Sequence, residues 1–243
     1  VAGSASTLGV LCALRLRNAP RLGRVFFVVL PVLIIVPVYL HGLAWATCLA
    51  SLNAWLLSLG MGGTFCRGWV GSWLTEVMAL LPLATGIALV GLQTVDRALV
   101  ETAALHGPDL QVFRRIELPL AAPFLLVGLG LLFLISLLDY SIPSLHAVNV
   151  FAMEIFIQYS LDDNPAAAVV TALPLIVVAA ALIVFGLARV RQAASVPLLR
   201  RARTVRCECW PRWFRLLQGV ALALLLAQAV VPVIGMLAQV GSA

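Results

Sequence analysis

The chain has 243 residues, of which 63% are hydrophobic and 11% are charged, and its mean hydropathy is +1.08. A soluble domain of this length needs far more polar surface, so the composition excludes that class and indicates an integral membrane protein. The apolar runs are long enough for membrane helices, which need about 20 residues each, and they lack the alternation of barrel strands. We therefore expect an all-α polytopic membrane protein with about six transmembrane helices, the first of them truncated.

The net charge is +6, and all 16 basic residues are arginine. They form three groups, with only Arg67 elsewhere: Arg15, Arg17, Arg21 and Arg24; Arg97, Arg114 and Arg115; and the eight residues from Arg189 to Arg215. These groups alternate with Arg-poor loops, as the positive-inside rule requires of cytoplasmic loops. Because the groups adjoin apolar runs and have few interleaved aromatic residues, we expect contact with the lipid bilayer and none with nucleic acid.

The first part of the chain is expected to enter the cytoplasm and then cross the membrane outward. Residues 1–14 are apolar but too short to span, and they do not begin with Met, so we interpret them as the end of a truncated helix in a fragment. We expect residues 25–49 to span as one helix kinked at Pro31 and Pro37. Residues 50–69 would follow as an outer segment. The tryptophans of this part suit the bilayer interface: Trp45, Trp55, Trp69 and Trp73.

The later spans follow the longest apolar runs, and we expect them over residues 70–92, 124–142, 166–188 and 216–240. Residues 143–165 form an outer segment that carries Glu154, Asp162 and Asp163 and no Arg. An Arg-rich cytoplasmic linker over residues 191–213 precedes the last span. We expect three aromatic residues near its end to lie on the membrane surface: Trp210, Trp213 and Phe214.

A polar loop at residues 101–119 interrupts the apolar pattern, and its residues predict two short helices. Asp96 can cap the first helix, Gly107 can close it in the left-handed conformation, and Pro108 cannot continue it. Asp109 can cap the second helix, which carries an apolar stripe at three-residue spacing and ends at Pro119. The stripe consists of Leu110, Phe113 and Ile116.

At this loop the chain resembles the membrane-spanning permease subunits of binding-protein-dependent ABC importers. Their signature runs Glu-Ala-Ala, then a Gly six residues after the Glu, then Ile-x-Leu-Pro. Six residues match at these offsets, with Thr102 replacing the first Ala: Glu101, Ala103, Gly107, Ile116, Leu118 and Pro119. The resemblance implies the type I permease fold over residues 1–190, with a cytoplasmic coupling loop at 94–123.

The same resemblance implies that the loop docks in a groove on a separate ATPase subunit. The residues expected at this contact are Glu101, Ala103, Leu105, Gly107, Phe113, Ile116, Leu118 and Pro119. The alternative for Glu101 is a solvated residue that only favours its helix dipole. Because residues 214–243 follow the last span that the family pattern requires, we expect them to begin a second permease half, with a lone C-terminal helix as the alternative.

The energy source must lie outside this chain, since no Gly-x-x-x-x-Gly-Lys-Ser/Thr loop and no lysine is present. We therefore expect no cofactor here, with ATP and Mg²⁺ on the partner ATPase, and no enzymatic activity in the chain. An ion-coupled carrier is the alternative, but it usually needs buried ionisable groups, and few occur in or near the spans. These are His41 and Glu76, while Asp139 lies near the outer end of its helix and Glu154 lies outside the spans.

Asp139 and Tyr140 begin a segment that resembles the end of the post-loop helix in permeases for iron(III), thiamine and polyamines. The resemblance implies iron(III) as the first expectation for the solute, delivered by a periplasmic or extracellular binding protein to a bacterial inner membrane. Asp139 and Tyr140 are weak candidates for the solute pathway. No metal site is expected, because the pair Cys207 and Cys209 supplies only two thiols and does not complete a zinc site.

Overall fold

The computed structural model describes residues 1–60, 67–160, 165–194 and 209–241, and these residues form helices and turns with no strand among them. The helices, in order, are α1 (Ala2–Arg17), α2 (Pro20–Ile35), α3 (Val38–Ser58), α4 (Gly68–Gln93), α5 (Arg97–Ala103), α6 (Asp109–Val112), α7 (Leu118–Leu138), α8 (Ser141–Leu145), α9 (Phe151–Ser160), α10 (Pro165–Ala194) and α11 (Arg212–Gly241), with a π-helical turn, η1 (Phe113–Glu117), between α6 and α7. The expected all-α class is confirmed.

Five helices among the described residues are long and apolar enough to cross a membrane: Val38–Ser58, Gly68–Gln93, Asp109–Leu138, Pro165–Arg189 and Arg212–Ile234. Three of them, Gly68–Gln93, Pro165–Arg189 and Arg212–Ile234, coincide with predicted spans to within a few residues at most ends, because long unbroken apolar runs specify them. The Asp109–Leu138 helix starts earlier than predicted, within the polar loop. Parts of the predicted outer and cytoplasmic segments lie outside the described residues, namely 61–66, 161–164 and 195–208. Asp162, Asp163 and Cys207 are among them.

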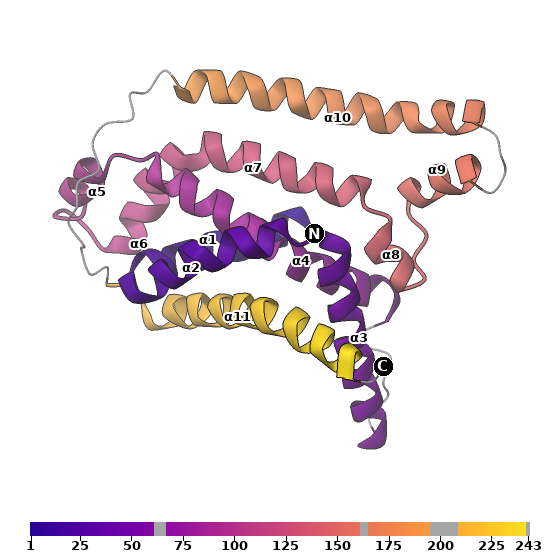
Figure 1. The fold of residues 1–243 in the computed structure, drawn as a ribbon. Helices are drawn as coiled ribbons and strands as arrows, with labels where there is room; N and C mark the ends of the chain where they lie inside the picture. The colour runs from indigo at the N-terminus through magenta and orange to yellow at the C-terminus, as the bar shows by residue number, and fades with distance from the viewer. Residues whose placement is uncertain (61–66, 161–164, 195–208, 242–243) are drawn as a thin grey trace.

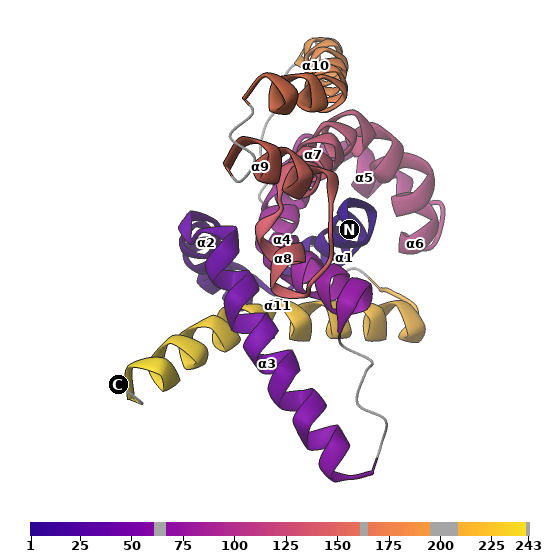
Figure 2. The ribbon, with the colours of Figure 1, turned by 90° about the vertical axis from the view of Figure 1, so that its right-hand side faces the viewer.

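Helices α1 and α4 form the centre of the bundle, and α7 and α11 pack against them (Figures 1 and 2). Four side chains of α1 have no exposed surface, namely Ala5, Cys12, Ala13 and Leu14. On α4, Ala84 approaches α1 so closely that a Cβ on Gly9 would stand 2.6 Å from its backbone carbon. Small residues therefore let these two helices meet along their length, as is common in membrane bundles.

The predicted single span over residues 25–49 is wrong. The chain forms α2 along the bundle and then α3, which runs across the direction of the other long helices at the far end (Figures 1 and 2). Val36 between them is extended, with φ −63° and ψ 127°. The reason is Pro37, which removes a backbone donor and forces the preceding residue out of the helical region. Pro31, in contrast, lies inside α2 without ending it.

Helix α11 crosses the bundle and is fastened to α3 by buried polar side chains. Gln228 hydrogen-bonds the Nδ1 atom of His41 at 2.8 Å and accepts a hydrogen bond from the Trp45 indole. The Nε2 atom of His41 meets the carbonyl oxygen of Leu33 at 3.0 Å. The predicted interfacial position of Trp45 is therefore wrong, whereas Trp55 is exposed near the end of α3. In hydrocarbon such polar groups must be satisfied within the protein, which fixes α11 to this bundle.

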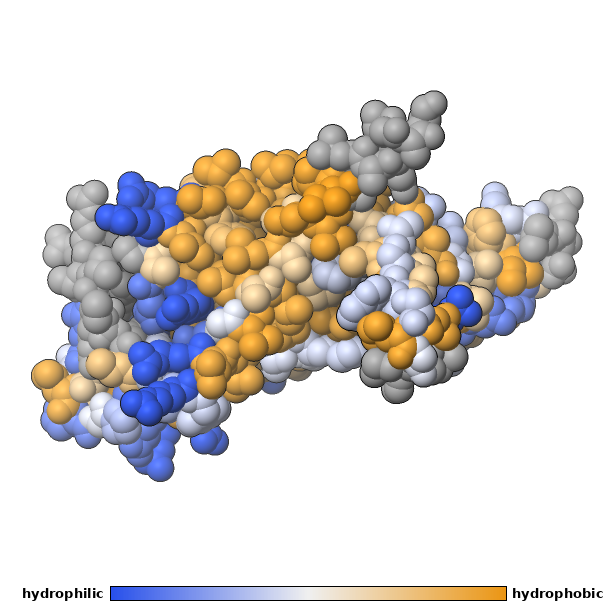
Figure 3. All heavy atoms as spheres, turned by 90° about the horizontal axis from the view of Figure 1, so that it is seen from below, coloured by the Kyte–Doolittle hydropathy of each residue, from blue (hydrophilic) through white to orange (hydrophobic). Residues whose placement is uncertain are grey.

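Apart from Arg67 at the start of α4, the arginine-bearing helix ends lie at one end of the bundle. Figure 3 shows hydrophilic residues gathered there, beside a broad apolar surface that covers the middle of the molecule. This end includes the last turn of α1, the first turns of α2 and α11, and the loop helices α5 and α6 (Figure 1). The arrangement agrees with the predicted grouping of arginines on one side of the membrane.

Candidate functional site

The first helix of the polar loop forms as its residues predict at the start but not at the end. The Oδ1 atom of Asp96 accepts a hydrogen bond from the Ala98 backbone N–H at 2.9 Å, which confirms the predicted cap. Helix α5 then ends at Ala103. Gly107 does not adopt a positive φ, so its predicted left-handed closure is wrong. Right-handed turn residues, including Ala104 at φ −75° and ψ −7°, end the helix instead.

The second half of the loop is continuous with a membrane helix. Pro108 is the N-cap of α6 and Asp109 lies in its first turn, so the prediction that Asp109 is the cap is wrong. Pro119 was predicted to end this helix, yet it lies in the first turn of α7, and the chain passes from α6 through η1 into α7 as a candidate span of 30 residues. The wider π-helical turn just before Pro119 accommodates the proline ring and its missing N–H.

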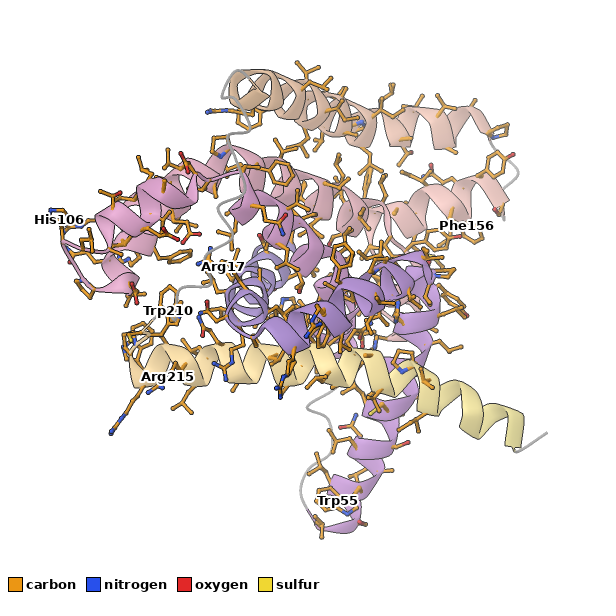
Figure 4. The ribbon with its side chains drawn as sticks, turned by 60° about the vertical axis from the view of Figure 1, so that its left-hand side comes forward. Arg17, Trp55, His106, Phe156, Trp210 and Arg215 are labelled. Atoms are coloured by element: carbon orange, nitrogen blue, oxygen red, sulfur yellow. The ribbon has the colours of Figure 1, made fainter. Side chains whose placement is uncertain are left out.

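The base of the loop is held by an ion pair between residues far apart in the chain. The Glu117 carboxylate accepts hydrogen bonds from both terminal guanidinium nitrogens of Arg17, one of them at 3.3 Å. The exposed fractions of the two side chains are 4% and 14%, so water has little access to the pair. Figure 4 shows Arg17 directed from the bundle toward the loop. A bidentate pair of this kind fixes both distance and orientation.

Aromatic side chains hold the loop from the other side. Phe113 is only 6% exposed, and its ring meets that of Trp210 edge to face at 5.8 Å. Trp210 also contacts Phe214 at 4.8 Å between ring centroids. The prediction that Trp210 and Phe214 lie on the membrane surface is wrong, because both are buried. Phe113 is also buried against this chain, and its contact with an ATPase stays a prediction. Packed between α4, α7 and α11, these aromatic rings bury more apolar area than they would on the membrane surface.

The Asp109 carboxylate adds a further contact here, since it accepts a hydrogen bond from the Cys209 backbone N–H. A cavity of about 500 Å³ lies beside this contact, lined by Pro108, Leu110, Gln111, Arg114, Arg115 and Pro211. The residues that precede α11 thus lie against the loop (Figure 4).

The predicted contact residues divide into an outer and an inner set. We call the outer set the loop tip: Glu101, Ala103, Leu105 and Gly107. Leu105 is 83% exposed, and the other three are half-buried. The inner set lies at the base of the loop, where Phe113 is buried, Ile116 and Leu118 are half-buried, and only Pro119 is exposed. Figure 4 shows His106, beside Leu105, at the extremity of the loop.

The weak candidates for the solute pathway lie at the opposite end of the bundle. Asp139 caps the end of α7 and its Oδ1 atom accepts a hydrogen bond from the Ser141 N–H at 2.9 Å. Tyr140 stacks on Phe156 at 5.0 Å. Glu76 of α4 lies close enough to Asp139 for mutual repulsion. One carboxylate oxygen of each acid is buried without a hydrogen-bond partner among the described residues.

Sequence reasoning missed the residues that hold the loop, namely Arg17, Glu117 and Trp210. Glu117 could have been noticed, because it is a charged residue inside the apolar Ile-x-Leu-Pro segment and an arginine group was already expected on the same side of the membrane. Its partner could not, since nothing in the sequence selects Arg17 from its neighbours. Among the described residues no group of three or more His, Cys, Asp or Glu side chains could hold a metal ion.

The loop combines an exposed tip with a base that is held in place by side-chain contacts. The exposed tip lies in α5 and the turn that precedes the helix Asp109–Leu138, and the base of that helix is held by the ion pair with Arg17 of α1 and by the ring contact with Trp210.

Comparisons with known proteins agree with this arrangement. Residues 5–196, which are most of the chain, match the family model of the binding-protein-dependent transport system inner membrane component. Neither the curated proteins nor the solved structures contain a match to the chain. The matched residues include most of α1, α2 through α10 and the whole of the loop, and α11 lies beyond them. The chain therefore belongs to the family of inner membrane permease components of binding-protein-dependent transport systems, the ABC importers.

Proposed function

We propose that the loop tip docks in a groove on a separate ATPase subunit, which binds ATP and Mg²⁺ and drives import through this chain. The observation that supports this most directly is the contrast between Leu105, 83% exposed, and Phe113, 6% exposed. An aliphatic side chain that projects alone into water has no role in the packing of its own chain. Its burial in a partner would contribute roughly 1.5–3 kcal/mol.

The inner set of predicted residues then has a different role from the one that the sequence suggested. Phe113, Ile116 and Leu118 do not touch the ATPase in this proposal but hold the tip at a fixed position on α7. Closure of the ATPase pair would move the tip, and α7 would move with it because the short turn at 104–108 joins the tip to a helix that is continuous from Asp109 to Leu138. The permease would thereby switch between inward and outward access.

The solute belongs to this proposal as well. Asp139 and Glu76 place two carboxylates near one another at the end opposite the loop, which favours a cation or a cationic complex over an anion. Iron(III) remains our first expectation, followed by polyamine and thiamine, with a periplasmic or extracellular binding protein delivering the solute in a bacterial inner membrane.

We also propose that residues 214–243 begin a second permease half after the Arg-rich linker at 191–213. The support is that α11 follows the matched family region and is nonetheless long and apolar enough to span. Its packing against α1, α3 and α4 would then join the two halves of a fused permease. A lone C-terminal helix would pack in the same way, so expression of the complete reading frame decides between them.

The experiment is co-purification of the chain, in its native length, with the ATPase encoded beside it, followed by solute-stimulated ATP hydrolysis in proteoliposomes. Leu105→Ala and Glu101→Ala should weaken ATPase retention, the former by roughly ten- to a hundredfold given the area that one leucine buries. Leu126→Ala is the matched control, because Leu126 is 45% exposed on α7 but lies outside the loop. Equal retention of Leu105→Ala and the control would overturn the docking proposal.

A further inference from the structure

A second cavity lies at the end of the bundle that carries the loop. Its volume is about 340 Å³, at the lower end of the roughly 300–1,000 Å³ typical of small-ligand sites. Three helices enclose it, and the lining residues that matter here are Leu16 and Arg17 of α1, Gly23, Arg24 and Phe27 of α2, and Leu92 of α4. The walls are mostly apolar, and no lining residue is acidic.

The charge at this cavity is positive and only partly neutralised. Arg17 is paired with Glu117, whereas the structure shows no ion pair for Arg24 within the described part of the chain. Arg24 is exposed, so its guanidinium stands at the mouth of the cavity. Helix α2 begins close by with no acidic residue in its first turn and no side chain capping its N–H groups. Its positive dipole end therefore adds to the attraction for an anion.

The apolar side of the cavity opens onto an exposed apolar face of α2. Phe27 is 81% exposed and follows Arg24 by three residues, which places it about 4.5 Å deeper along α2 at a rise of 1.5 Å per residue. Val28 beside it is 66% exposed. The order from the cytoplasmic surface inward is thus a guanidinium and then hydrocarbon, which is the order of a phosphate group and its acyl chains in a phospholipid.

We propose that this cavity binds the phosphate headgroup of an anionic phospholipid of the cytoplasmic leaflet. Arg24 donates hydrogen bonds to the phosphate, and Phe27 packs against an acyl chain. A guanidinium suits this role because it presents several donors to phosphate oxygens at once. The bound headgroup lies next to Arg17, so it adds negative charge beside the residue that holds the loop through Glu117. Lipid occupancy is therefore coupled to the position of the loop base, whatever solute is transported.

The test measures lipid binding to the purified full-length chain by native mass spectrometry after delipidation. Phosphatidylglycerol and phosphatidylcholine with identical acyl chains are the probes. We expect the wild type to retain phosphatidylglycerol preferentially, and Arg24→Gln to lower its affinity by roughly ten- to a hundredfold, as loss of charged hydrogen bonds does. Arg21→Gln is the matched control, because Arg21 is an exposed arginine of the same helix that does not line the cavity. It should change the affinity by no more than about twofold, since a surface charge away from the bound group contributes little.

Three outcomes would overturn the proposal. They are equal retention of the two lipids by the wild type, equal losses in the Arg24 and Arg21 variants, and displacement of the lipid by millimolar glycerol phosphate, which would identify a site for soluble phosphate. Arg24→Lys keeps the charge and should retain the preference for phosphatidylglycerol, which separates loss of binding from misfolding.

Discussion

Glu117 and Arg17 are a hundred positions apart in the chain, and their side chains form the bidentate pair that joins the coupling loop to α1. Because both are nearly inaccessible to water, removal of one partner leaves a poorly solvated charge. We expect Glu117→Gln and Arg17→Gln each to lower the free energy of unfolding by roughly 1–3 kcal/mol. In the double variant the two losses should be strongly non-additive, as a thermal-stability cycle in detergent would show. Additive losses would mean that the two residues act independently.

Variants at Phe113 and Leu105 should distinguish a loss of folding stability from a loss of contact with the ATPase. Phe113→Ala removes a buried ring from its contact with Trp210, so we expect a loss of about 3–5 kcal/mol in the free energy of unfolding. Leu105→Ala should leave that free energy within about 0.5 kcal/mol, because the side chain contacts water. The melting temperature of each variant, measured without the ATPase, checks both expectations. A large drop for Leu105→Ala would show that the tip packs against this chain.

Gly107 offers a test of the corrected loop geometry. Since its φ is not positive and an added Cβ would meet only the Gln111 side-chain oxygen at 3.6 Å, Gly107→Ala should cost no more than about 0.5 kcal/mol. The larger strain predicted from a left-handed glycine should not occur. If stability is unchanged but ATPase retention falls, the partner and not the local backbone requires glycine at this position. A large loss of stability would restore the left-handed interpretation.

His146, at the outer end after α8, should make stability depend on pH. Burial lowers the pKa of His146 below its ordinary value of 6.5, and the ring meets the Thr75 hydroxyl at 3.0 Å. The unfolded chain therefore binds the proton more readily than the folded one, so stability rises with pH. The contribution is complete above pH 6.5 and is lost as the pH falls through the lower folded pKa. Wild type should lose melting temperature between pH 7.5 and pH 5 relative to His146→Gln. Parallel curves for the two proteins would exclude this role.

The sequence predicts the long helices well and the loop only in part, for physical reasons that differ between elements. Helices α4, α10 and α11 follow from apolar runs that have few other ways to satisfy their backbone in a membrane. The Asp96 cap is also predictable from local sequence, since it depends only on the first residues of its own helix. The burial of Phe113 depends on Trp210, nearly a hundred residues later, and no local pattern identifies that partner. The break after α2 lay within reach, because Pro37 restricts Val36, but a kink and a turn have the same local signal.

The hydrogen bonds of Gln228 also have a consequence for the order in which the protein is made. His41 and Trp45 are synthesised 187 and 183 residues before the side chain that satisfies them. At about 5–20 residues per second, a ribosome needs roughly 10–40 seconds to cover that distance. During this interval the His41 and Trp45 side chains lack the hydrogen bonds that Gln228 supplies. The nascent helices must therefore stay near the insertion machinery or near water until α11 is synthesised. A chain stalled before α11 would present this polar face to lipid and become a substrate for membrane quality control.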